Sequence, residues 1–116
     1  MEIIDIYDIE GNKLNKTHIR GNSLNKNEYV MGVDIWIKND REQILMTQRH
    51  PKKSYPKKWE CSGGWLISGE DSLGGALREV EEEIGIRLDK IEGKKIKRWM
   101  WEEENMIVDV FLFKKY

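Results

Sequence analysis

The sequence is poor in cysteine and in long apolar runs, and it carries almost no net charge. Its 116 residues include one cysteine, Cys61, which excludes an internal disulfide and a cysteine-rich zinc site. Twenty Lys and Arg side chains face 21 Asp and Glu side chains, so a net charge of −1 gives no case for binding nucleic acid or an anionic membrane. No apolar run approaches the roughly 18 residues of a membrane-spanning helix. The N-terminal segment has no basic stretch followed by an apolar one, so we expect no signal peptide and a cytoplasmic protein.

What remains is the composition of one folded domain. Hydrophobic residues make up 39% of the chain and charged residues 35%, a balance that supports a core and argues against disorder. A chain of this length is a usual size for one domain, and it shows no repeat, low-complexity tract or linker. We therefore expect a single domain over residues 1–116.

Short segments of alternating polar and apolar residues predict a fold rich in strands. In residues 29–38, Val33 and Ile35 share one face and Trp36 points the other way. Residues 49–58 are expected to form a basic loop that holds both prolines. The predicted strands cover residues 3–7, 13–19, 29–38, 44–48, 65–67, 95–101 and 106–113. With one main helix among them, they favour an α+β fold.

Residues 72–84 have the periodicity of that helix. Asp71 or Ser72 can cap its N-terminus, and Gly85 stands where a left-handed C-cap favours glycine. The apolar stripe recurs at i, i+3, i+4, i+7 and i+11, at Leu73, Ala76, Leu77, Val80 and Ile84.

Three carboxylates, those of Glu79, Glu82 and Glu83, share one side of this predicted helix, beside its apolar stripe. Carboxylates held this close repel one another and favour a compensating cation. Hard oxygen ligands select Mg²⁺, Mn²⁺ or Ca²⁺ over softer metals. The alternative is a solvent-exposed acidic face that binds nothing, which the helix alone does not exclude.

The context of the helix adds a motif. From Gly64 the sequence GWLISGEDSLGGALREVEEEIGI fits the pattern G-x5-E-x7-R-E-U-x-E-E-x-G-U, in which U is apolar. All nine fixed positions agree, at Gly64, Glu70, Arg78, Glu79, Val80, Glu82, Glu83, Gly85 and Ile86. This segment resembles the Nudix box of the Nudix hydrolase superfamily. The resemblance implies a Nudix-like α/β/α sandwich with a mixed sheet.

Nudix domains usually continue beyond the position of Tyr116 with another strand and a helix. We therefore expect a sandwich that lacks these elements. A bare sheet face would favour a homodimer, or else the chain is a truncated form with impaired activity.

The resemblance also implies roles for particular residues. Glu70 and Arg78 would hold the metal ligands in place, because a guanidinium can bind a carboxylate bidentately. A carboxylate would take the proton of the attacking water. The candidates for this base are Glu82, the later run of Glu102, Glu103 and Glu104, and Asp109. The expected ligands of Mg²⁺ or Mn²⁺ are the carbonyl of Gly63 and the side chains of Glu79, Glu82 and Glu83.

Substrate contacts are expected outside the box. Arg49 ends a predicted strand and Lys57 lies in the basic loop, so both can bind a phosphate, although each can equally be an ordinary surface charge. Trp65 can stack on a flat group, as can other tryptophans near the box, or it can belong to the core. Asp109 interrupts an apolar strand, where a buried charge needs a metal or an arginine as its partner. We take these four residues as candidates for substrate binding.

The segment RHPKKSYPKKWECSGG resembles a Nudix subgroup related to isopentenyl-diphosphate isomerases. Two departures argue against isomerase activity: the catalytic cysteine would fall at Gly63, two residues from Cys61, and the metal-binding histidine would fall at Trp65. We therefore expect a Mg²⁺-dependent hydrolase that cleaves the diphosphate linkage of a nucleoside diphosphate derivative or a related organic diphosphate, with no nucleic-acid or membrane partner. The alternative is a diphosphate-binding module with little or no turnover, and an isomerase ranks last.

Overall fold

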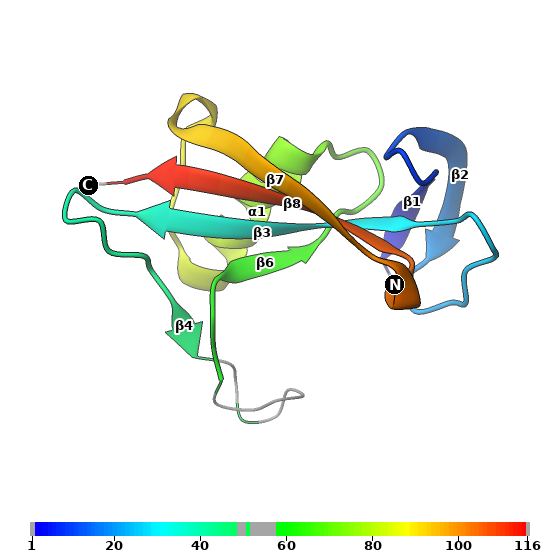
Figure 1. Cartoon of the computed structure of the whole chain (residues 1–116), viewed down its shortest axis with the longest axis horizontal. Helices are drawn as coiled ribbons and strands as arrows, with labels where there is room; N and C mark the ends of the chain where they lie inside the picture. Colours follow the sequence, from blue (N-terminus) through cyan, green and yellow to red (C-terminus); the bar gives the residue numbers. More distant parts are fainter. Residues whose placement is uncertain (1, 49–50, 52–57, 116) are drawn as a thin grey trace.

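A four-stranded mixed sheet forms the centre of the protein (Figure 1). The structure, a computed structural model, describes residues 2–48, 51 and 58–115. The strand order is β6-β3-β8-β7. The central pair β3–β8 is parallel, and the pairs β3–β6 and β7–β8 are antiparallel. The strands span Ser62–Trp65 (β6), Val30–Lys38 (β3), Met106–Lys114 (β8) and Gly93–Trp101 (β7).

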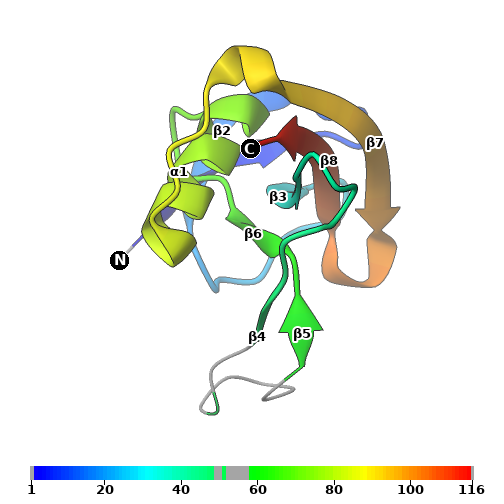
Figure 2. The same cartoon turned by 90° about the vertical axis from the view of Figure 1, so that its left-hand side faces the viewer.

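Two smaller strand pairs lie outside this sheet. The hairpin of β1 (Ile3–Tyr7) and β2 (Lys13–Ile19) lies at one end of the molecule (Figure 1). β4 (Thr47–Gln48) pairs with β5 (Trp59–Glu60), as Figure 2 shows below the sheet. Two short 3₁₀ helices, η1 (Lys90–Glu92) and η2 (Glu102–Glu104), flank β7.

The helix α1 spans Ser72–Ile84, as the periodicity predicts. The side chain of Asp71 accepts a hydrogen bond of 2.7 Å from the backbone N–H of Gly74, which makes Asp71 the N-cap. Gly85 closes the helix in the left-handed conformation, at φ 71°, which glycine adopts without strain. α1 lies against one side of the sheet (Figure 2). Among the described residues, α1 is the single α-helix. The expected α+β fold with a mixed sheet is confirmed.

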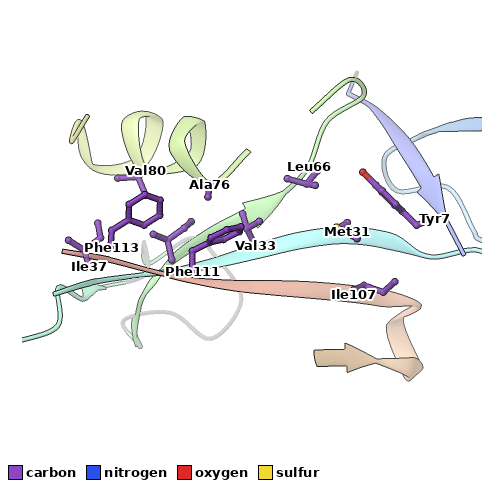
Figure 3. Close-up of a cluster of buried hydrophobic side chains, with 11 residues drawn as sticks. Tyr7, Met31, Val33, Ile37, Leu66, Ala76, Val80, Ile107, Phe111 and Phe113 are labelled. Atoms are coloured by element: carbon purple, nitrogen blue, oxygen red, sulfur yellow. The ribbon is translucent and has the colours of Figure 1, made fainter. Parts of the chain in front are cut away.

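The core fills the space between α1 and the sheet. Alternate residues of β3 and β8 face the helix, because successive side chains of a strand point to opposite faces. Figure 3 shows Val80 and Ala76 of the helix above Phe113, Phe111 and Val33 of the strands. All five are buried. Burial of such side chains stabilises the fold by roughly 25 cal/mol for each Å² of apolar surface removed from water. This burial holds the helix against the sheet.

The other alternate residues of these strands point to the opposite face of the sheet. Trp36 is one of them and is 43% exposed, which confirms the prediction that it faces away from Val33 and Ile35. Two predicted strands are wrong in extent. Of residues 44–48, only Thr47–Gln48 form a strand, and Ile44 makes an isolated bridge with Lys38.

The strand expected at residues 65–67 instead spans Ser62–Trp65. Glycine disfavours a strand on propensity alone, but Gly63 and Gly64 pair with Asp34 and Val33 of β3, and this pairing decides the outcome. Most of the predicted basic loop, residues 49–50 and 52–57, lies outside the described residues. Within the described residues, no helix has both the length and the apolar character needed to cross a membrane. The expected homodimer stays a prediction.

Candidate active site

Arg78, on α1, connects the acidic side chains predicted to form the site. Its Nε lies 2.6 Å from Glu70 Oε2 and one terminal nitrogen lies 3.0 Å from Glu70 Oε1, so the guanidinium holds this carboxylate bidentately. The other terminal nitrogen donates to Glu79 at 2.9 Å and to Glu82 at 3.0 Å. The hydrogen bond with Glu70 raises the pKa of Arg78, so the guanidinium stays charged.

This arrangement ties the helix to the loop before it. Glu70 also accepts a hydrogen bond of 2.9 Å from the backbone N–H of Ile67, and Arg78 donates to the carbonyl of Trp65 at 3.0 Å. The loop between β6 and α1 is thereby fixed at both of its ends. The glutamates of α1 therefore have defined positions relative to β6.

The glycine pair of β6 lies directly under these glutamates. The backbone N–H of Gly63 donates to Glu83 Oε1 at 3.2 Å. A Cβ atom at Gly64 would lie 2.6 Å from both carboxylate oxygens of Glu79, so a side chain at this position would displace that carboxylate. Glycine at position 64 therefore leaves room for a carboxylate against the backbone.

The donor set at this corner suits a hard cation. Carboxylates from Glu79, Glu82 and Glu83 and the carbonyl of Gly63 are the oxygen ligands that Mg²⁺ and Mn²⁺ prefer. Within the described residues, however, no three His, Cys, Asp or Glu side chains converge as a ready metal site. The physical reason is visible at Arg78, which compensates the charges of Glu79 and Glu82 through one nitrogen. The residues fit a divalent cation in kind, and only one carboxylate oxygen of Glu82 contacts Arg78.

A cavity of about 480 Å³ opens from this corner across the face of the sheet opposite α1. Most of the residues that line it are glycine, acidic residues or tryptophan. Its lining includes Arg20, Asp34, Glu60, Cys61, Gly63, Gly64, Trp65, Glu83, Trp99, Trp101, Met106 and Val108. We call this cavity the cleft.

Four features of the cleft set its chemistry. Trp99 and Trp101 lie side by side on β7, with ring centroids 6.3 Å apart. The guanidinium of Arg20 lies 5.5 Å from the centre of the Trp65 ring, a cation–π contact. Burial raises the pKa of the Asp34 carboxyl, and the nearby Glu60 raises it further. Burial likewise raises the pKa of the Cys61 thiol, so this cysteine is a poor nucleophile.

The structure brings most of the predicted site residues together. Gly63, Trp65 and Glu83 line the cleft, and Glu79 lies against Gly64. Glu103 and Glu104, from the run proposed as an alternative base, line a second cavity of about 490 Å³, which Trp65 lines as well. Arg49 and Lys57 lie outside the described residues. The catalytic and metal-binding roles stay predictions.

Asp109 is placed differently from its predicted role in substrate binding. Its side chain is fully buried, and its carboxylate accepts hydrogen bonds of 2.5 and 3.0 Å from Arg98 and of 2.5 Å from Ser72. Lys95 lies 3.3 Å away. Burial alone would raise the pKa of Asp109, but the hydrogen bonds from Arg98 and Ser72 outweigh it and lower the pKa. The structure therefore gives Asp109 an arginine as its partner and places it away from the cleft, because it points to the helix side of β8.

Sequence reasoning missed Asp34 and Arg20 as lining residues. Asp34 carried a signal: it is a charged residue in an apolar strand and shares the phase of Trp36, which predicts that it faces away from the core. Arg20 carried none, because it follows β2 and reaches the cleft only through the tertiary structure.

Comparison with known proteins places this geometry in a family. The model of the NUDIX domain matches residues 28–115. An uncharacterised Nudix hydrolase of Listeria monocytogenes is 36% identical over 91 residues, which are 77% of this chain and 54% of that protein. An RNA pyrophosphohydrolase of Rhodospirillum rubrum is 39% identical over 59 residues, or 51% of this chain and 34% of that protein. The chain thus spans about half the length of the Listeria relative.

Solved structures agree on the fold. DR0079 of Deinococcus radiodurans superposes with a TM-score of 0.79 at 19% identity, over 99% of this chain and 73% of that one, a likeness of fold alone. A structure from work on MutT of Aliivibrio salmonicida and Vibrio cholerae gives a TM-score of 0.63 at 28% identity, over 73% of this chain and 64% of that one. The isomerase-like subgroup stays a prediction.

Proposed function

The chain belongs to the NUDIX domain family, and we propose that it is a hydrolase that depends on a divalent metal and cleaves the diphosphate linkage of a nucleoside diphosphate derivative or a related organic diphosphate. One observation carries the proposal. Glu83 and Glu79 lie against the paired glycines of β6, at the corner from which the cleft opens. A diphosphate bound at this corner would extend its organic part into the cleft.

Glu79, Glu82, Glu83 and the carbonyl of Gly63 would hold the cation, Mg²⁺ or Mn²⁺. When bound, it supplies charge neutralisation of the diphosphate oxygens and a lower pKa of a coordinated water. Arg78 is a positioning residue in this proposal. Its bidentate contact with Glu70 connects α1 to the preceding loop and so holds the glutamates of the helix in position beside β6.

Glu82 is the preferred general base. Its side chain is 61% exposed, whereas that of Glu79 is 15% exposed, so Glu82 has access to the water that attacks phosphorus. A carboxylate oxygen of Glu82 would accept the proton of that water. Glu103 and Glu104 are weaker candidates, because they belong to η2 and line the second cavity, whereas the glycine pair lines the cleft.

A diphosphate-binding module without turnover is the second candidate. The ion pairs of Arg78 with Glu79 and Glu82 favour it, since they already compensate two of the carboxylates that a cation would need. Metal uptake and turnover separate the two candidates.

The test compares Glu83→Gln with Glu81→Gln. Glu81 lies on the same helix but is exposed and pairs with Arg87, so it is a matched control for the loss of one carboxylate. Calorimetry with MgCl₂ and MnCl₂ measures metal affinity, and release of phosphate products from a panel of nucleoside diphosphate derivatives measures turnover. We expect Glu83→Gln to lose at least tenfold in metal affinity and most of its turnover, with the melting temperature preserved.

We expect Glu81→Gln to behave as the unaltered protein in both assays. Equal metal affinity and turnover in the two variants would reject the metal assignment. Metal uptake without turnover on any diphosphate would favour the binding module.

A further inference from the structure

We propose that the cleft binds a ribonucleoside diphosphate with its sugar hydroxyls on Asp34 and its base stacked on Trp99, so that the protein prefers ribose to 2′-deoxyribose. The inference rests on the proposed function for the position of the diphosphate. It concerns the part of the substrate that the cleft holds.

Strand pairing fixes the geometry of the cleft. One row across the four strands runs from Trp65 to Gly32, then to Val108 and Trp99. Two tryptophans of the cleft lining therefore stand at the ends of this row. Between them, Val108 also lines the cleft, whereas Gly32 is buried.

Asp34 lies in the next row, which runs from Gly63 to Asp34 and then to Val110. Neighbouring strands lie about 4.8 Å apart, so Asp34 is one strand from Gly63 and two strands from Trp99, or about 10 Å from the latter across the sheet. The order across the sheet is therefore the glycine corner, then Asp34, then Trp99. A nucleotide has the same order of diphosphate, sugar and base.

The Asp34 carboxylate is available to a ligand. It is partly buried, it lines the cleft, and no hydrogen-bond donor or cation among the described residues contacts it. A desolvated carboxylate without a donor costs stability, and a ligand with hydroxyl groups removes that cost. The two vicinal hydroxyls of a ribose are donors that one carboxylate can accept together, and 2′-deoxyribose lacks one of them.

Trp99 is better placed than Trp65 to stack on the base. The Trp65 ring already carries the guanidinium of Arg20 on one side. Trp99 is partly buried, and Trp101 supports it at 6.3 Å. Stacking on an aromatic ring tolerates every base, so the cleft selects the sugar more strongly than the base.

The test measures binding and does not depend on turnover. The probes are the α,β-methylene analogues of ADP and 2′-deoxy-ADP, titrated by calorimetry with MgCl₂ and again with EDTA. We expect the unaltered protein to bind the ribose analogue about tenfold more tightly, as for one hydrogen bond to a charged group. Asp34→Ala should bring the two affinities within about twofold and leave the melting temperature equal or higher.

Two tryptophan variants complete the design. Trp99→Leu should weaken both analogues by a similar factor, about tenfold, because it removes the stacking surface. Trp36→Leu is the matched control, since Trp36 stands on the same face of the sheet but outside the cleft, and it should change neither affinity.

Equal affinity for the two analogues in the unaltered protein overturns the inference, as does no binding of either analogue. An equal loss of both analogues in Asp34→Ala also overturns it, because that result would make Asp34 a ligand of the metal or the phosphates. Hydrolysis of diphosphates without any sugar preference keeps the proposed function and ends this inference. Selective binding of the ribose analogue without hydrolysis of any diphosphate keeps this inference and rejects the proposed hydrolase function.

Discussion

The buried ion pair between Asp109 and Arg98 provides a direct test of the structure. The perturbation is Asp109→Asn, which keeps the size of the side chain and removes its charge. In the protein, this carboxylate accepts from Arg98 at 2.5 and 3.0 Å and from Ser72 at 2.5 Å, with no exposure to solvent. The amide of Asn presents an N–H group to at least one of these donors, so the pair is broken.

The magnitude follows from the surroundings. Removal of one member of a fully buried pair costs about 3–5 kcal/mol, because the other charge is left without a partner. The Arg98 side chain is 38% exposed and can recover part of its hydration, so we expect a loss of about 2 kcal/mol for Asp109→Asn. Ser72→Ala removes one hydrogen bond and should cost about 1 kcal/mol. Lys95→Ala removes a half-exposed ion pair of 3.3 Å and should cost about 0.5 kcal/mol or less.

Urea denaturation followed by tryptophan fluorescence at several pH values measures these differences. The pKa of Asp109 is lowered in the folded protein, so its charge stabilises the fold above the unfolded value near 4, and this contribution is lost as the pH falls below it. The gap between the unaltered protein and Asp109→Asn should therefore be full at pH 7 and shrink below about pH 4. An equal cost for Asp109→Asn and Lys95→Ala, or a gap that does not depend on pH, would refute the buried pair.

Two further predictions concern single contacts. Arg78→Lys keeps the charge but loses the bidentate grip on Glu70, so metal affinity measured by calorimetry should fall about 10- to 100-fold, whereas Arg87→Lys on the exposed surface should change nothing. The hydrogen bond from Lys16, with further donors, holds the pKa of Glu28 at about 2, so its charge contributes stability that is lost as the pH falls from about 4.5 toward 2. Thermal unfolding of Glu28→Gln should accordingly vary less with pH over that range, and a parallel decline of both proteins would contradict the assignment.

Local signals in the sequence were enough for the helix and for five of the seven predicted strands, whose bounds agree with β1, β2, β3, β7 and β8 to within two residues. The apolar stripe, Asp71 and Gly85 together define α1, because each acts within a few residues of the chain. Alternation likewise predicted that Trp36 faces away from the core. The strand at Ser62–Trp65 was misplaced, since two glycines carry no strand signal and only pairing with β3 makes them part of the sheet.

The candidate site divides in the same way. The resemblance to the Nudix box implied that Arg78 can hold a carboxylate bidentately, and only the structure shows that this carboxylate is Glu70. The partner of Asp109 was not predictable, since Arg98 comes from a neighbouring strand and the register between the strands decides which side chains meet. For the same reason the position of Asp34 between Gly63 and the tryptophans was not predictable, although its phase indicated the face on which it lies.

The two glycines of β6 link the two faces of the sheet. Consecutive residues of a strand point to opposite faces, so Gly64 faces α1 and accommodates Glu79, whereas Gly63 pairs with Asp34 on the side of the cleft. Glu83 contacts the backbone N–H of Gly63 from the helix, at the edge where the two sides meet. In the proposed function, the reacting diphosphate lies at this edge. Its organic part binds in the cleft, on the face of the sheet that the helix does not cover. Changes at Asp34 or Trp99 should therefore alter which substrate binds without altering metal affinity, and changes at Arg78 or Glu83 should alter metal affinity.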